Sequence, residues 1–271
     1  MAIITISPQF GSSSGIIAEA LKEELNFDYL GKVKLEEELV KKYGIPEKNV
    51  QKYDGKKPVF WDVFSQDNDR YLHFLKTEMY KRARKGNCII MGRGGQVLLK
   101  DVPGTLHVRV IAPIQLRIER LKQRFTCHDR RAEQLVRRSD HDLGGFHKFF
   151  FDVDWGDPDL YDLVVNTRSF SIEHAVYLIR ETIDTLGIRG KEAEAERKLA
   201  DLCIGQEVIT RIMYNEKLPI ESLNVNVENG VVTLQGSAVT ADERDRCGTA
   251  ARQVPEVKDI INTVSFIPSD I

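Results

Sequence analysis

The chain has 271 residues, of which 42% are hydrophobic and 30% are charged, and its formal net charge is −2. This length allows two domains with separate cores, and the near-neutral charge gives no basis for non-specific binding to nucleic acid. No apolar run approaches the roughly 20 residues that span a bilayer, and residues 1–7 have the pattern of a strand rather than of a signal peptide. The four cysteines show neither metal-binding nor redox spacing, so we expect free thiols in the cytoplasm.

The N-terminal part of the chain alternates predicted strands and helices. A β-branched run over 2–7 predicts a buried strand, which a Gly/Ser loop over 10–15 connects to a helix over 16–25. Further strands are predicted at 87–91, 106–112 and 161–166, and further helices at 35–43, 69–85, 113–125 and 171–186. The stretch 126–151 is polar and arginine-rich and then aromatic, and no element is assigned to it. The alternation predicts a three-layer α/β domain with a parallel sheet over residues 1–188.

The C-terminal part has a different order of elements. Residues 189–195 are predicted to be a linker, and residues 196–271 a small α+β domain with the order αββαβ. Its predicted elements are a helix at 199–214, strands at 223–227 and 231–235, a helix at 241–254 and a last strand at 257–266. The dipeptide Asn229-Gly230 between alternating hydrophobic residues is the strongest short-range sign of a hairpin.

The Gly/Ser loop is suited to binding phosphate. Backbone N–H groups at a helix N-terminus point at an anion, and the helix dipole adds about half a positive charge there. A complete P-loop also has a lysine that reaches the β/γ-phosphates and a hydroxyl that holds Mg²⁺. Residues 1–19 contain no basic side chain. The candidate phosphate-binding residues are Gly11, Ser12, Ser13, Ser14 and Gly15.

Residues 3–12 and 17–21 resemble the start of the cytidylate-kinase-like family, whose members have the P-loop fold of nucleoside monophosphate kinases. The resemblance implies a kinase-like fold, with ATP and Mg²⁺ as cofactors if the protein is active. A gap-free match places Ser14 where the lysine belongs, Ile16 at the hydroxyl position and Pro8 at the first glycine. The loop is therefore degenerate relative to the family.

Two further segments carry the resemblance. Residues 89–95 resemble the family's segment whose arginine contacts the acceptor nucleotide, which makes Arg93 an acceptor-binding candidate at the end of a predicted strand. The alternative is a surface arginine in a tight glycine turn. Residues 154–167 closely match the terminal element of the family, a turn followed by a core strand.

Arginines between positions 117 and 138 resemble the lid of such kinases, which closes over the transferring phosphate. As a cluster they favour polyanion binding, and for any single arginine a solvated helix face is the alternative. The catalytic candidates are Arg120, Arg124 and Arg131, and Asp140 is a second acceptor-binding candidate. The arginine that the family often has three residues after this aspartate is absent, because Leu143 stands there. No metal site is predicted, since the histidines near Cys127 have no ligand spacing.

Residues 225–236 and 257–264 resemble the hairpin and the last strand of a BON domain. The resemblance implies a binding module whose partner is a membrane lipid, a small ligand or a protein. A hairpin with two helices could equally form a homo-oligomer surface. No catalytic constellation is found in this part of the chain.

Two functions compete. The missing lysine and hydroxyl favour a protein that binds a nucleotide or phosphorylated small molecule as a weak or inactive kinase, used in binding or regulation together with the BON module. The intact remainder of the fold favours an active ATP-dependent kinase of a nucleoside monophosphate such as CMP or dCMP. A purely structural or oligomeric role predicts no nucleotide affinity.

Overall fold

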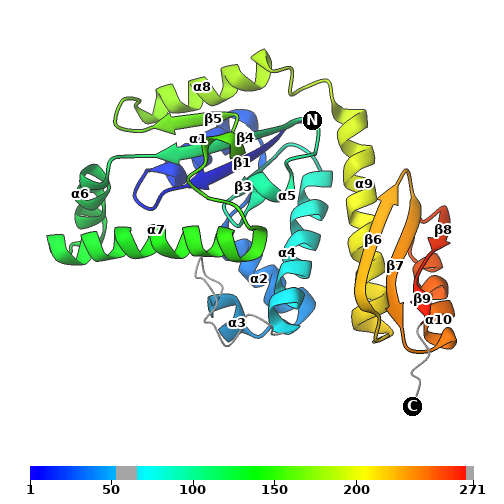
Figure 1. The fold of residues 1–271 in the computed structure, drawn as a ribbon. Helices are drawn as coiled ribbons and strands as arrows, with labels where there is room; N and C mark the ends of the chain where they lie inside the picture. The colour runs from blue at the N-terminus through cyan, green and yellow to red at the C-terminus, as the bar shows by residue number, and fades with distance from the viewer. Residues whose placement is uncertain (53–65, 267–271) are drawn as a thin grey trace. The chain divides into compact units, whose positions relative to one another are not determined.

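The computed structural model describes residues 1–52 and 66–266. The chain divides into two units, Met1–Glu192 and Ala193–Ile271, and the secondary structure of both is shown in Figure 1. Each unit has its own sheet and its own cluster of buried apolar side chains.

A parallel sheet of five strands forms the centre of the first unit, with the order β2-β3-β1-β4-β5. The strands are β1 (Ile3–Pro8), β2 (Asp28–Leu30), β3 (Cys88–Met91), β4 (Thr105–Ile111) and β5 (Leu163–Asn166). All four pairings are parallel. Apolar β-branched runs such as those of β1 and β3 suit a sheet that is buried on both faces. The predicted parallel α/β sheet is confirmed.

Helices cover both faces of this sheet. α1 (Ser14–Leu25) and α8 (Ile172–Thr185) share one apolar core with the strands. α4 (Gln66–Arg84) and α5 (Gly95–Leu98) contact β3 and β1. Figure 1 shows α8 on one side of the sheet and α4 on the other. The first unit therefore has the predicted three layers.

The helix α2 (Lys32–Tyr43) begins two residues after β2 and packs against α4. It is followed by the short helix α3 (Glu47–Lys52). The sequence pattern does not predict β2, because a three-residue strand is too short to show a period of two. This strand nevertheless places the start of α2 at the carboxyl edge of the sheet.

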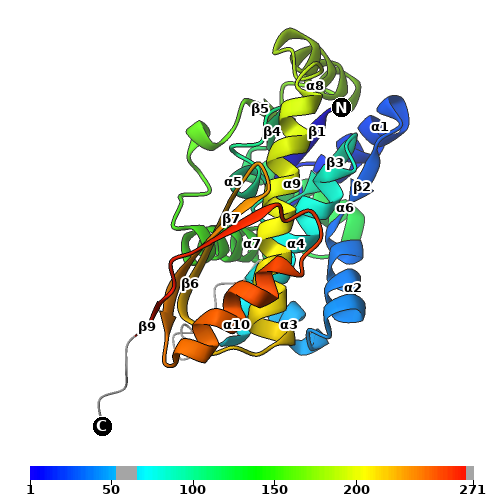
Figure 2. The ribbon, with the colours of Figure 1, turned by 90° about the vertical axis from the view of Figure 1, so that its right-hand side faces the viewer.

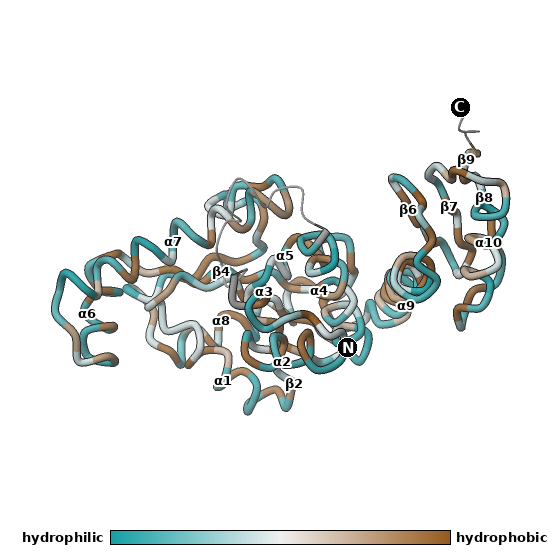
Figure 3. The backbone as a smooth tube through the Cα atoms, turned by 90° about the horizontal axis from the view of Figure 1, so that it is seen from below, coloured by the Kyte–Doolittle hydropathy of each residue, from teal (hydrophilic) through white to brown (hydrophobic). Residues whose placement is uncertain are grey.

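The stretch 126–151, to which the sequence pattern assigns no element, is mainly the helix α7 (Asp129–Phe151). It packs against α6 (Ile114–Phe125) through a small apolar cluster of its own. Two adjacent glycines and several charged residues obscure the helix in the sequence, but Ala132, Val136 and Phe146 are buried at helical spacing. Figure 3 shows the corresponding alternation of hydrophobic and hydrophilic residues along α7. A 3₁₀ turn (Pro158–Leu160) then leads into β5.

The second unit is a smaller α+β fold. The helix α9 (Glu192–Ile209) continues as a π-helical segment (Thr210–Asn215) and precedes β6 (Glu221–Glu228) and β7 (Val231–Ala238). α10 (Ala241–Arg252), β8 (Asp259–Asn262) and β9 (Ser265–Phe266) complete it. Both helices pack on the face of the sheet that carries Val232 and Leu234 (Figure 2). The predicted αββαβ order is present, with the last strand divided into two.

The hairpin of the second unit is held by a carboxylate. The side chain of Asp201 on α9 accepts hydrogen bonds from the N–H groups of Asn229 (2.8 Å) and Gly230 (2.9 Å), both of which have positive φ. The predicted Asn-Gly turn is therefore confirmed. α9 begins at Glu192, before the predicted start at Leu199, because the residues between them are good helix formers. Within the described residues, none of the helices combines the length and apolarity that crossing a bilayer requires.

Candidate phosphate-binding site

The loop between β1 and α1 turns sharply at two residues. Gly11 has φ +84°, and a Cβ atom there would lie 3.0 Å from the Cβ atom of Arg117, so the loop packs closely on α6. Ser13, which precedes α1, has φ 65° and ψ 15°, a left-handed conformation that is costly for a residue other than glycine. Ser13 thus adopts a turn conformation that is usually occupied by glycine.

This turn leaves backbone donors at the N-terminus of α1. Within residues 1–52 and 66–266, no acceptor pairs with the N–H groups of Gly11, Ser13, Ser14 and Gly15. These four residues also line a cleft of about 1130 Å³, which we call the loop cleft. Unpaired donors and the positive end of a helix make this a place where an anion is stabilised.

The carbonyl groups of the loop are held by residues from two distant segments. Arg120 on α6 donates to the Gly11 carbonyl oxygen (3.3 Å) and to the hydroxyl oxygen (2.8 Å) and carbonyl oxygen (3.0 Å) of Thr167. The Thr167 hydroxyl in turn donates to the Ser12 carbonyl oxygen (3.0 Å). Burial lowers the pKa of Arg120. Arg120 lines the loop cleft, but these hydrogen bonds hold the loop itself in place.

The candidate serines differ in their exposure to the cleft. Ser12 is fully buried, its hydroxyl oxygen has no hydrogen-bond partner, and it does not line the loop cleft. Ser13 and Ser14 do line the cleft. The structure therefore brings together the N–H groups of the loop and two of its three hydroxyls.

A second cleft of about 400 Å³ adjoins the first, and we call it the Arg93 cleft. Arg93 follows β3, has φ 57° and is buried. Its guanidinium forms an ion pair with Glu36 on α2 and lies 5.9 Å from the centre of the Phe146 ring. The charge of this acceptor-binding candidate is thus already partnered by a carboxylate. Six residues line both clefts: Pro8, Phe10, Lys32, Met91, Ser139 and Leu143.

Two lid-type candidates, Arg124 and Arg131, and the acceptor-binding candidate Asp140 differ in their relation to the clefts. Arg124 is exposed, lines the loop cleft and lies 5.4 Å from the centre of the Phe125 ring. Arg131 is exposed on α7 and lines neither cleft. Asp140 also lines neither cleft, and its carboxylate accepts two hydrogen bonds from the guanidinium of Arg117. Of these three candidates, the structure brings Arg124 to the loop cleft.

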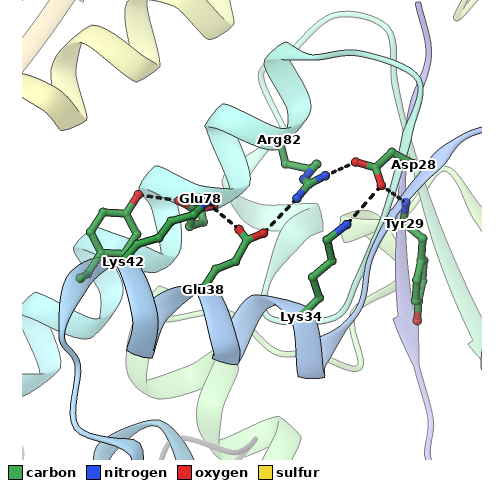
Figure 4. Close-up of polar contacts among 8 residues, drawn as sticks. Asp28, Tyr29, Lys34, Glu38, Lys42, Glu78 and Arg82 are labelled. Carbon is green, nitrogen blue, oxygen red and sulfur yellow. Dashed lines mark hydrogen bonds and ion pairs between the residues drawn. The ribbon is translucent and has the colours of Figure 1, made fainter.

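The helix α2, which begins at the junction of the clefts, is fastened to α4 and β2 by a chain of polar contacts (Figure 4). Glu38 and Glu78 share a hydrogen bond that raises the pKa of Glu38. Lys42 lies 3.2 Å from each of these carboxylates, and Arg82 joins Glu38 to Asp28. Burial opposes ionisation of Glu78, yet its hydrogen bonds with Glu38, Tyr43 and Lys42 bring its pKa below the usual value. The position of α2 is therefore fixed by several contacts at once.

Sequence reasoning missed two residues at this site: Lys32, which lines both clefts, and Thr167, which holds the loop. A third residue, Arg138, belongs to the predicted arginine cluster and lines the Arg93 cleft beside Asp142. Recognition of β2 would have placed Lys32 after the carboxyl end of a parallel strand, where ligands bind in such sheets. No local signal points to Thr167, since its contact with Ser12 spans 155 positions.

The fold and the loop together define an α/β protein of the P-loop kinase type, with a second, BON-like unit. The chain belongs to the cytidylate kinase-like family, which matches residues 3–169, and residues 201–268 match the BON domain. Both resemblances predicted from the sequence are confirmed.

Curated relatives and a solved structure agree with this assignment. The chain is 23% identical to the cytidylate kinase of Methanococcus aeolicus over 67% of its own length and 97% of that protein. It is 24% identical to the cytidylate kinase of Pyrococcus horikoshii over 72% of its length and 96% of that protein. The crystal structure of an uncharacterized protein from Eubacterium ventriosum has a TM-score of 0.54 at 20% identity and covers 68% of this chain and 99% of that one. This likeness concerns the fold.

Proposed function

We propose that residues 1–188 bind the phosphates of a nucleotide in the loop cleft and transfer phosphoryl groups slowly or not at all, so that binding is the main role of this unit. The observation that carries the proposal is the combination of four unpaired N–H groups with a loop that has no basic side chain. Backbone donors alone bind a phosphate. They do not replace the charged group that neutralises the transferring phosphoryl group.

The size of the expected defect supports weak turnover. Removing one fixed donor to a transition state typically costs about 10²–10³ in rate, and removing an arginine finger about 10³–10⁵. Ser14 and Ile16 stand where the resemblance expects a lysine and a hydroxyl, and Ile16 is 61% exposed beside the loop cleft. Arg120 is bonded to the loop carbonyls and Arg93 to Glu36. Neither is an unengaged replacement for the lysine.

ATP and Mg²⁺ are the cofactors in this proposal. The unpaired N–H groups fit the oxygens of a polyphosphate. The described residues contain no group of three or more metal-binding side chains. Mg²⁺ would therefore be held chiefly by the phosphates and water, with Glu19 as the carboxylate that lines the loop cleft.

An active CMP or dCMP kinase is the second candidate. The continuity of the two clefts favours this candidate. The loop cleft would hold the donor, and the Arg93 cleft would hold the acceptor through Arg93 and Arg138. The relatives of the chain are named cytidylate kinases. In this reading Arg124 would help to neutralise the phosphoryl group during transfer.

Calorimetry with ATP, ADP, CMP and dCMP, with and without Mg²⁺, tests the proposal, alongside a phosphoryl-transfer assay. The cytidylate kinase of Methanococcus aeolicus serves as the active control. We expect ATP or ADP to bind and transfer to be at least about 100-fold slower than in the control. Transfer at the rate of the control would establish the second candidate. No binding of any nucleotide would overturn both and leave a structural role.

We also propose that residues 196–271 are an interaction module without catalysis, in a protein of the cytoplasm. The sheet of this unit buries the side that faces α9 and α10, while Asn224, Asn226 and Gln235 are exposed on its strands. Its partner would be a membrane lipid, a small ligand, a protein or a second copy. Co-sedimentation with anionic vesicles and measurement of the mass in solution distinguish the lipid and the second copy from the others.

A further inference from the structure

The sheet of the second unit has a long strand at one edge. β6 stands first in the sheet order β6-β7-β8, and within the described residues its eight residues pair with β7 alone (Figure 1). We infer that this edge binds the same edge of a second copy of the chain, in an antiparallel pairing centred on Val225. The inference rests on the proposed role of residues 196–271 as an interaction module, and it names the partner of that module.

The first argument is the direction of the backbone groups of β6. Val225 lies opposite Leu234 on β7, and the Leu234 carbonyl oxygen accepts a hydrogen bond (2.9 Å) from the N–H group of Thr263, which follows β8. The backbone of Leu234 is thus turned toward β8, so Val225 and Leu234 form a non-hydrogen-bonded pair. Val225, and likewise Val227 two residues further on, therefore direct their N–H and C=O groups to the free edge. Such a row of backbone donors and acceptors is a template for a further strand.

The second argument is the symmetry of the exposed strand about Val225. Residues 223–227 read Leu-Asn-Val-Asn-Val, so apolar residues and asparagines alternate in the same way in both directions from the centre. A two-fold axis at this centre gives three kinds of cross-strand pair: Val225 with Val225, Asn224 with Asn226, and Leu223 with Val227. Both members of each pair have the same character, which suits an interface between two identical surfaces.

The third argument is that the apolar core of the second unit is open at β6. Leu223, Val225 and Val227 lie on the face that packs against the core, yet they are half-buried, whereas Val232 and Leu234 on β7 are fully buried. The difference arises because β6 has a neighbouring strand on one side and β7 on both. The same three side chains of a second copy would cover the open side and remove apolar surface from water, which stabilises the pairing.

The fourth argument is the polar row on the opposite face. Asn224 and Asn226 are exposed there, and the Asn224 amide donates a hydrogen bond (3.1 Å) to the side-chain oxygen of Gln235 across the β6–β7 pair. An amide side chain both donates and accepts, so Asn224 of one copy and Asn226 of the other can extend this row. The two faces of β6 are therefore both self-complementary in the same register.

Charge favours a second copy over an anionic occupant. The described strands β6, β7, β8 and β9 contain no lysine or arginine, so they offer no cation to a lipid headgroup or a phosphate. The acidic residues of β6 are Glu221 and Glu228 at its two ends. The two-fold axis at Val225 sets Glu228 opposite Ser222, so the glutamates of the two copies do not face each other. Regular pairing ends at Ser222, where a positive φ of 51° and a bulge interrupt the strand.

The test is sedimentation equilibrium of the full-length protein, which measures the dissociation constant of a dimer. It compares two double variants, Asn224→Lys with Asn226→Lys and Asn224→Lys with Asn226→Glu. In the proposed register the first variant sets lysine opposite lysine at two symmetrical places, and the second sets lysine opposite glutamate. We expect the dissociation constant of the first to be roughly 10-fold or more above that of the second, and the difference to shrink in high salt.

A backbone variant tests the edge itself. Val225→Pro removes an N–H group that points to the free edge rather than to β7, so we expect it to abolish the dimer in a protein that still folds. Asn226→Pro is the matched contrast, because it removes a donor of the β6–β7 ladder and should lower the urea midpoint. If Val225→Pro also fails to fold, the two double variants decide the question.

The outcomes separate this inference from the proposed function. A dimer with equal dissociation constants in the two double variants would overturn the inference, because the contact would then lie elsewhere. An unsubstituted protein that stays monomeric at every concentration would also overturn it. The proposed interaction module would stand in that case if the monomer co-sediments with anionic vesicles or binds a protein. A monomer without any of these partners would refute the proposed module itself.

Discussion

Arg117 and Asp140 form a bidentate ion pair, in which Nη1 and Nη2 of the guanidinium each donate a 2.8 Å hydrogen bond to one carboxylate oxygen. The pair joins α6 to α7, and Arg117 also donates to the carbonyl oxygen of Phe10 at 3.4 Å. The pair therefore supports the backbone of the Gly/Ser loop between β1 and α1. This contact gives Asp140 a structural partner, whereas the sequence predicted an acceptor-binding role for it.

We expect Asp140→Asn to lower the free energy of unfolding by about 1–3 kcal/mol, because the buried guanidinium of Arg117 loses its charged partner. Urea denaturation measures this change. Asp142→Asn is the matched control, since it faces the exposed Arg138 across 3.6 Å and should cost under about 1 kcal/mol. Unchanged stability combined with weaker binding of CMP would instead support the acceptor-binding role.

Ser14→Lys should create or raise ATPase or kinase activity, because it returns a cation to the loop at the position that the family match assigns to lysine. One fixed donor is worth roughly 10²–10³ in rate, so a gain of at least about 10-fold is expected from an otherwise incomplete site. A steady-state assay of ADP release with Mg²⁺ measures it. Ser14→Gln controls for side-chain length without charge. Equal activity in the lysine and glutamine variants would contradict the account of a degraded loop.

Ser13→Gly should stabilise the protein. The left-handed backbone at φ 65° costs a non-glycine residue about 1–2 kcal/mol, which the substitution removes. The greater chain entropy of glycine in the unfolded state offsets about half of this gain. A net gain of roughly 0.5–1 kcal/mol is expected in denaturant unfolding. Ser14→Gly, at a right-handed helical position, should have the opposite sign. A loss of stability in Ser13→Gly would mean that the serine hydroxyl contributes more than its backbone costs.

His147 should make the folded protein less stable in acid. Burial lowers its pKa to about 4, and nearby Arg109 and Arg93 add to the shift, while the ring donates from Nδ1 to the Leu143 carbonyl oxygen at 2.8 Å. Since the unfolded state binds a proton near pH 6.5 and the folded state does not, stability falls as the pH drops from about 6.5 to 4, by about 3 kcal/mol.

Urea midpoints measured at pH 7 and pH 4.5 check this dependence. His147→Phe keeps an aromatic ring against the ring of Trp155, with which His147 stacks at 6.1 Å, and should flatten the profile. His128→Gln, at an exposed position, should leave it unchanged. A profile in His147→Phe as steep as in the unsubstituted protein would assign the acid sensitivity to other groups.

The sequence by itself determined the elements whose signals are local. The β-branched run of β1, the Gly/Ser loop and the helix after it lie within 25 residues, so hydrophobic period and turn chemistry are sufficient to predict them. The Asn229-Gly230 turn is similarly local. The family resemblance also rests on such contiguous segments, and it identified the missing lysine at Ser14.

Tertiary structure alone decided which side chains meet. The sheet order β2-β3-β1-β4-β5 brings Lys32 to the loop, and Thr167 reaches Ser12 across the fold. The contacts of Arg93 and Arg120 could not be predicted from the sequence either, because their partners Glu36 and Thr167 lie 57 and 47 positions away. Periodicity specifies the face of an element, but the contacts between elements depend on how the whole sheet assembles, and the function of each charge depends on those contacts.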